Sequence, residues 1–157
     1  MIQTIINDPL VLTSNSSPIV FDATNIRTRC AFCSNGGWLD YENGNPNFKI
    51  FGNNYNGYYN ANFSASISSS TAGVIAIGLY EDGVLIPDTI RAVTIDAPND
   101  YETISINRKI RVCPRGTTNI TIGSVASVPT PDDPITPIET EIPIITNATF
   151  NLSRSNQ

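Results

Sequence analysis

The stretch YYNANFSASIS at residues 58–68 decides the fold class, because apolar or aromatic side chains alternate in it with small polar ones. Successive side chains of a β-strand point to opposite faces of its sheet, so this alternation predicts a strand with one face in a core. The other face is wet or lines an interface. The expected core positions are Tyr59, Ala61, Phe63, Ala65 and Ile67.

The next stretch, VIAIGLY at residues 74–80, is apolar on both faces and predicts a central strand that is covered on both sides. It leads into Asp82-Gly83, a pair typical of a tight hairpin turn whose residues need positive φ. The chain returns over residues 84–86, and Pro87 ends the pairing because proline has no N–H to donate.

The remaining chain shows almost no helical periodicity, and Gly, Asn, Asp and Pro interrupt it at short intervals. Short strands separated by turns are typical of an all-β sandwich or barrel. Further strands are expected over residues 90–95, 101–106, 109–112, 119–122 and 149–153, with turns at 96–100 and 114–116.

Two segments stand apart from this pattern. Residues 128–143 contain five prolines, which exclude a central strand and favour an extended chain. This segment is either a surface loop or an arm that reaches a neighbouring subunit or partner. Residues 1–18 form either a first strand or a docking arm, and residues 19–157 are expected to form the folded domain.

Composition limits the possible functions. The 157 residues and 17.0 kDa fit one domain, and the net charge of -5 with no basic stripe argues against nucleic-acid binding. The absence of histidine excludes Ser-His-Asp, Cys-His and histidine–zinc chemistry. Carboxylate-pair hydrolysis, calcium binding or no chemistry remain, and the composition favours the last. We therefore expect a protein that is not an enzyme and that has no cofactor and no metal.

The N-terminus lacks the basic and apolar regions of a signal peptide, and no apolar run is long enough to span a membrane. We expect synthesis in the cytoplasm and no membrane partner. The three cysteines, Cys30, Cys33 and Cys113, cannot all pair within one chain. Two small core residues and one exposed thiol are expected, and a redox or zinc role for Cys30 and Cys33 is the less favoured alternative.

Six carboxylates could be considered for hydrolysis, which needs two of them about 5–10 Å apart across a glycosidic bond. All six fall at predicted turns or strand ends, where solvated side chains are the simpler interpretation. They are Asp40, Glu42, Glu81, Asp82, Asp100 and Glu102.

The segment from Trp38 to Asn47 holds the single Trp, a Tyr and several amides, which are the residues that sugar-binding loops use for stacking and hydrogen bonding. It is either a glycan site, with Trp38, Tyr41 and Asn43 as contacts, or a structural loop anchored by an aromatic side chain.

In their order along the chain, four segments resemble the tumour-necrosis-factor-like jelly roll shared with complement-type globular heads. The first three are NGYYNANF at residues 56–63, IGLYEDGV at 77–84 and SINRKIRV at 105–112, and the last is ATFNL at 148–152. The resemblance covers residues 19–153 and implies a two-sheet jelly-roll sandwich. The segment PRGTTN at 114–119 and the long proline-rich segment depart from the family pattern.

Members of this family are normally homotrimers that pack through aromatic and aliphatic faces, so the resemblance gives Tyr58, Tyr80 and Phe150 a use in a trimer interface. The alternative is that these aromatic side chains complete the monomer core. The chain is also similar to small jelly-roll proteins encoded among the head genes of tailed bacteriophages.

This similarity implies a capsid decoration or head-fibre protein, made in the host cytoplasm and attached to the outside of the virion. Its expected partners are other copies of itself and the major capsid protein or another virion protein. The alternative function is a carbohydrate-binding adhesin module that recognises a host-surface glycan.

Overall fold

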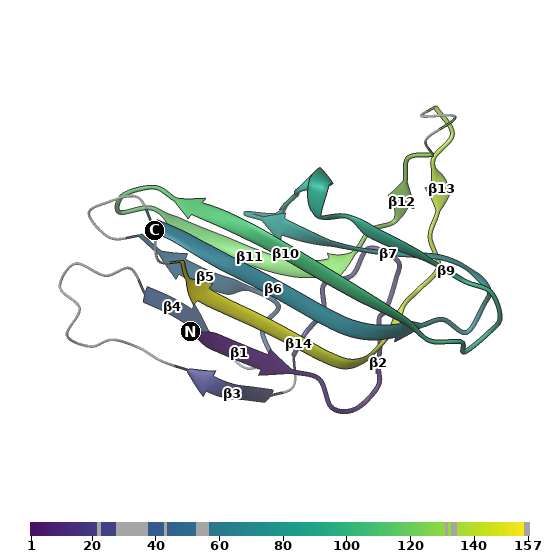
Figure 1. Cartoon of the computed structure of the whole chain (residues 1–157), viewed down its shortest axis with the longest axis horizontal. Helices are drawn as coiled ribbons and strands as arrows, with labels where there is room; N and C mark the ends of the chain where they lie inside the picture. Colours follow the sequence, from purple (N-terminus) through teal and green to yellow (C-terminus); the bar gives the residue numbers. More distant parts are fainter. Residues whose placement is uncertain are drawn as a thin grey trace.

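A computed structural model of the chain describes residues 1–21, 23–27, 38–42, 44–52, 57–130, 132 and 135–155, with the backbone alone for 23–27 and 38. In this part of the chain, two large antiparallel sheets pack face to face (Figure 1). The all-β, two-sheet sandwich predicted from the sequence is therefore confirmed.

The first sheet has the strand order β10-β6-β14-β1-β3, and β2 pairs with β14 beside β1. Its long strands run almost the whole length of the molecule in Figure 1. The bounds are β1 (Ile2–Ile5), β2 (Leu10–Val11), β3 (Ala23–Arg27), β6 (Gly57–Ser68), β10 (Glu102–Val112) and β14 (Ile144–Arg154).

The second sheet has the strand order β4-β5-β11-β7-β8, and β9 also pairs with β7. A short 3-10 helix, η1 (Pro87–Thr89), follows β8. The bounds are β4 (Trp38–Tyr41), β5 (Phe48–Phe51), β7 (Gly73–Glu81), β8 (Val84–Leu85), β9 (Arg91–Ile95) and β11 (Thr117–Ser124). From β5 onward the chain repeatedly crosses from one sheet to the other, which is the connectivity of a jelly roll.

The alternation predicted over residues 58–68 is present in β6, whose five expected core side chains are all buried. The sequence also predicted two separate strands over 101–106 and 109–112, and this prediction was wrong. Glu102–Val112 is one continuous strand because Asn107 and Arg108 keep the register, opposite Asn62 and Ala61 of β6. A long partner strand therefore overrides a polar pair that looks like a break.

The predicted hairpin after β7 is confirmed, since Asp82 and Gly83 have φ values of 50° and 81°. β7 is also covered on both sides, as its apolar pattern predicted. Inside, Ile75, Ile77 and Leu79 are buried, and outside, a Cβ added to Gly78 would lie 2.6 Å from Leu85 Cδ1 and 3.0 Å from Val125 Cγ2.

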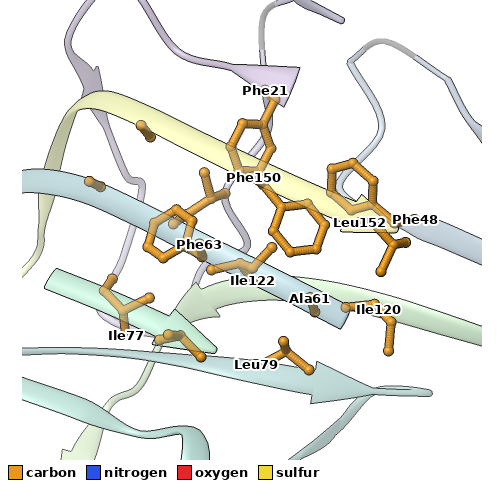
Figure 2. Close-up of a cluster of buried hydrophobic side chains, with 14 of the residues drawn as sticks. Phe21, Phe48, Ala61, Phe63, Ile77, Leu79, Ile120, Ile122, Phe150 and Leu152 are labelled. Atoms are coloured by element: carbon orange, nitrogen blue, oxygen red, sulfur yellow. The ribbon is translucent and has the colours of Figure 1, made fainter. Parts of the chain in front are cut away.

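The core lies between the two sheets and has an aromatic cluster at its centre (Figure 2). The Phe150 ring centroid is 4.5 Å from that of Phe48 and 6.1 Å from that of Phe21, and Phe63 lies 6.4 Å from Phe21. Each fully buried Phe or Ile stabilises the fold by about 1.5–3 kcal/mol. This packing holds the backbones of β6 and β14 rigidly.

The N-terminal segment belongs to the sandwich. β1 lies between β14 and β3, and further along the chain the backbone around Pro18 pairs with Gly123 of β11. Ser17 N–H also donates to Ser124 Oγ at 2.8 Å, so this segment is tied to the second sheet.

Residues 128–143 are named here the proline arm. At its base, β12 (Ser127–Val128) pairs with β13 (Ile138–Glu139), and this small hairpin extends away from one end of the sandwich (Figure 1). The prolines of the arm that the structure describes, Pro129, Pro137 and Pro143, lie outside both strands, as the sequence predicted. Both chain termini lie at the opposite end of the sandwich (Figure 1).

Candidate functional site

The outer side of the first sheet carries an unusually uniform set of side chains, and we name it the amide face. Its members project away from the core because the alternate residues of each strand are buried. None of them is charged, although the face spans four strands. They are Gln3, Ile5, Asn60, Asn62, Ser64, Ser66, Thr103, Ser105, Asn107, Thr146, Thr149, Asn151 and Ser153.

A row of four amides crosses this face. The strand register places Gln3 of β1 opposite Asn151 of β14, Asn151 opposite Asn62 of β6, and Asn62 opposite Asn107 of β10. Directly opposed residues have Cβ atoms about 4.5–5.5 Å apart, so the row is a band of amides in mutual reach. Each amide can both donate and accept hydrogen bonds, and none carries a charge that would have to be desolvated.

The next row toward the proline arm carries hydroxyls. Thr149, Ser64 and Ser105 lie opposite one another, and Ile5 pairs with Thr149 on the β1 side. These side chains are shorter than the amides. The face is therefore polar apart from Ile5, and the buried core lies directly behind it.

A local irregularity in β14 leaves one polar atom without a partner. The register with β6 shifts between Thr146 and Thr149, and Asn147 has a positive φ of 49° at this bulge. Within the described residues, Thr146 Oγ1 is buried and makes no hydrogen bond. A buried unsatisfied hydroxyl costs about 1–3 kcal/mol, so this bulge carries a local cost in stability.

Beyond the amide face, the same side of the sheet carries positively charged side chains. Lys109 Nζ lies 4.7 Å from the centroid of the Tyr58 ring, and Arg111 is opposite Tyr58 in the strand register. Such a cation–π contact is worth about 0.5–1 kcal/mol at an exposed site. The half-buried Tyr58 therefore lies at the border between the uncharged and the basic surface.

The three aromatic side chains considered for a trimer interface are placed in three different environments. Tyr58 lies beside the amide face, whereas Phe150 is fully buried between the sheets and completes the monomer core. Tyr80 is half-buried on the outer side of the second sheet, and its hydroxyl donates to the Ser124 carbonyl oxygen at 2.9 Å. Burial raises the pKa of Tyr80. The structure does not bring the three side chains together.

Tyr80 instead lines a small pocket of about 310 Å³. Ser17, Pro18 and Gly123 form one wall, and Thr121, which donates to Asn47 Oδ1 at 2.8 Å, lies beside Tyr80. No lining residue is charged, and the full lining is Ser16, Ser17, Pro18, Tyr80, Gly83, Thr121, Gly123 and Ser124.

Of the three residues considered for glycan contact, Tyr41 is buried. Its ring stacks on Phe48 with 4.3 Å between centroids, and its hydroxyl donates to the Phe21 carbonyl oxygen at 3.1 Å. The Tyr41 ring is therefore packed in the core and is not accessible to a sugar. The Trp38 side chain and Asn43 lie outside the described residues, as do Cys30 and Cys33. Cys113 is an exposed free thiol.

Four of the six carboxylates lie at opposite ends of β7. Glu81 and Asp82 are at the hairpin, and Asp82 Oδ1 accepts from Asn119 N–H at 2.8 Å. Asp100 and Glu102 lie beyond the other end, where β9 turns into β10, so about 25 Å of strand separates the two pairs. No glycosidic bond could lie between them.

Within the hairpin pair, burial raises the pKa of Glu81, and the charge of Asp82 raises it further while Arg108 lowers it. Arg108 forms an ion pair with Asp88 of η1, and this pair joins the edges of the two sheets.

Among the described residues, no group of three or more metal-binding side chains is placed to hold an ion. In the same part of the chain, no helix has the length and apolarity to cross a membrane.

The amide row was not predicted from the sequence, although one signal for it was present. The polar half of residues 58–68 was assigned to an outer face that is wet or lines an interface. Its extension through Gln3 and Asn151 depends on pairing between the first and last strands of the chain. No local pattern gives the register of two strands so distant in sequence.

The fold is similar to that of the globular domain of the zebrafish complement 1qA protein, with a TM-score of 0.54 and 14% sequence identity. The match covers 96% of this chain and 93% of that chain. The likeness confirms the tumour-necrosis-factor-like jelly roll that the order of the segments predicted, and at this identity it establishes the fold alone.

Two carbohydrate-active proteins give weaker matches. A family 35 carbohydrate-binding module of Cellvibrio japonicus Abf62 has a TM-score of 0.34 and 8% identity over 98% of this chain and 96% of that chain. A Podospora anserina mannanase carrying such a module has a TM-score of 0.33 and 11% identity over 97% of this chain and 29% of that chain. These scores support no conclusion about the present chain. The sequence matches no protein-family model, and no curated protein matches it significantly.

Proposed function

We propose that this chain is a non-enzymatic structural protein of a virus particle, a homotrimer that decorates the outside of a tailed-bacteriophage capsid. The observation that carries the proposal is the amide face, the uncharged part of the outer side of the first sheet, which spans four strands and ends where Lys109 and Arg111 begin. Depletion of charge distinguishes the centre of protein interfaces from ordinary surface. A second copy of the chain is the occupant we assign to it.

Self-association suits this face because amides and hydroxyls are both donors and acceptors. Two copies can satisfy one another without any charge complementarity. The family that the chain resembles is normally homotrimeric, which supports a trimer, but its members pack through aromatic and aliphatic faces, so the use of a polar face is specific to this proposal.

The proline arm is the element we assign to capsid docking. It extends from the sandwich, whereas the N-terminal strand is enclosed by its neighbours in the sheet (Figure 1). The arm also exposes apolar side chains that a monomer does not need, with Ile135 88% and Ile138 43% exposed. An extended arm adds contacts to a partner without remodelling the sandwich.

Light scattering on the purified protein tests the trimer. We expect a mass near three times 17.0 kDa. An Asn62→Arg variant, which places a charge at the centre of the amide face, is expected to lower the mass to that of a monomer. Thr94→Arg is the matched control, because Thr94 is exposed on β9 of the second sheet, and it should leave the trimer intact.

Circular dichroism would show that both variants fold. A parent protein that is monomeric, or an Asn62→Arg protein that still forms trimers, would overturn the assignment of this face. The capsid role has a separate test, which is to search for the chain by mass spectrometry in purified particles of the virus that carries the gene. Its absence from those particles would refute a structural role in the virion.

A further inference from the structure

The two ends of the long axis carry opposite charge, and this begins as a pattern in the sequence. Residues 103–131 and 142–157 contain no Asp or Glu, whereas residues 50–90, 92–107 and 116–153 contain no Lys or Arg. From residue 92 onward, like charges are therefore grouped along the chain rather than mixed. The fold then decides where each group lies.

One group forms a basic end. Arg111 lies opposite Tyr58, and Lys109 opposite Asn60, where β10 approaches its last residue. Arg154 lies opposite Tyr59 at the end of β14, and Arg115 occupies the turn between β10 and β11. All four basic side chains are exposed, and the chain termini lie at this same end (Figure 1).

The other group forms an acidic end, from which the proline arm projects. Asp96, Asp100 and Glu102 lie in and after the turn between β9 and β10. Glu141 is attached beside them, since its N–H donates to the Val74 carbonyl oxygen and its carboxylate accepts from Thr71 Oγ1 at 2.8 Å. Glu139 of β13 adds an exposed carboxylate.

The two ends are too far apart to neutralise one another. Arg111 lies nine positions after Glu102 in β10, which corresponds to about 30 Å of strand. The Debye length at physiological salt is about 8 Å, so each end presents its own charge to the surroundings. Tyr101, 63% exposed between two carboxylates, adds an aromatic ring on which a cation could stack.

We propose that the basic end of one copy binds the acidic end of a second copy, so that the protein stacks head to tail along its long axis. The argument is the complementary charge of two surfaces of the same chain. Such a contact joins different surfaces, so it does not close on itself as a twofold dimer does and can continue into a column. The head-to-tail contact uses residues outside the amide face. Monomers and trimers can therefore both stack through it.

Salt dependence provides the first test. In about 0.02 M salt, where the Debye length is about 20 Å, the mass from light scattering should rise with protein concentration. In about 0.5 M salt, where the Debye length is about 4 Å, the mass should fall to that of a single, unstacked unit. That unit, monomer or trimer, reports separately on the proposed function. A mass that does not depend on salt would overturn head-to-tail stacking.

Charge reversal tests the surfaces themselves. Asp100→Lys with Glu102→Lys should abolish stacking, and so should Lys109→Glu with Arg111→Glu. An equimolar mixture of the two variants should stack again, because each then offers the charge that the other lacks. The control Lys49→Glu with Arg91→Glu changes the net charge as much as the second variant does, but on the second sheet. It should stack like the parent. Failure of the mixture to stack, or loss of stacking in the control, would refute the proposal.

Discussion

At the scale of single residues, Tyr80 links the outer side of the second sheet to the N-terminal segment. Its hydroxyl donates to the carbonyl oxygen of Ser124, and Ser124 N–H donates to the carbonyl oxygen of Ser17 at 2.9 Å. A neutral hydroxyl suits this half-buried place, because burial penalises the ionised form and so raises the pKa of Tyr80.

Replacing Tyr80 with Phe is expected to give a stability deficit that depends on pH. At neutral pH the variant loses one hydrogen bond, a cost of about 0.5–1.5 kcal/mol. Above about pH 10, the unfolded tyrosine releases its proton while the folded one, with its raised pKa, retains it. The parent therefore loses stability as pH rises through the folded pKa, and the deficit should narrow.

Urea unfolding of both proteins from pH 8 to pH 11 measures this difference in the free energy of unfolding. A deficit that stays constant over the whole range would show that the folded and unfolded Tyr80 side chains ionise alike.

At the scale of elements, β7 is closely covered on its outer side. Gly78 lies where Leu85 of β8 and Val125 cover the outside of the strand, so the absence of a Cβ allows this second layer to approach. The apolar run over residues 74–80 was sufficient to predict burial on both faces. It did not predict which side chains provide the cover.

A Gly78→Ala variant should therefore destabilise the protein by about 1 kcal/mol, because its Cβ would lie 2.6 Å from Leu85 Cδ1, the mobile end of a half-buried side chain, and 3.0 Å from Val125 Cγ2. Chemical denaturation measures the change. In a Leu85→Ala background the same substitution should cost clearly less, since the nearest atom has been removed. Equal costs in the two backgrounds would mean that the strain does not arise at Leu85.

Sequence reasoning succeeded for elements whose pattern is local. The alternation in β6 and the Asp82-Gly83 turn could be predicted because period and φ preference are properties of neighbouring residues. The division of β10 was mispredicted because Asn107 and Arg108 look like a break until β6 supplies their partners. The amide row required a register between β1 and β14, and only the folded chain contains that information.

At the scale of the whole molecule, the sandwich and the proline arm are separate parts. The arm is fixed at its base by β12 and β13, and by the Thr140 hydroxyl, which donates to the Val125 carbonyl oxygen. Beyond this base, none of the arm's described residues adds a side chain to the buried core cluster. The order of segments predicted the jelly roll, but the projection of the arm depends on how the sheets end.

Replacing residues 129–137 by a short glycine-serine link should therefore leave the melting temperature within a few degrees of the parent value. The trimer should persist, because the amide face is untouched. Binding to capsids should be lost, as measured by co-sedimentation with particles that lack the chain. A truncated protein that still co-sediments with them would refute docking through the arm.

The position of β14 between β6 and β1 has a consequence for how the protein is made. The hydroxyl of Thr4 in β1 donates to the carbonyl oxygen of Phe150 in β14, which lies 146 residues later in the chain. β1 therefore cannot complete its sheet until β14 has been synthesised, and a fragment that lacks β14 leaves the facing edges of β1 and β6 open. Such distant pairing is associated with folding in milliseconds to seconds. A product that ends before β14 should aggregate through those edges.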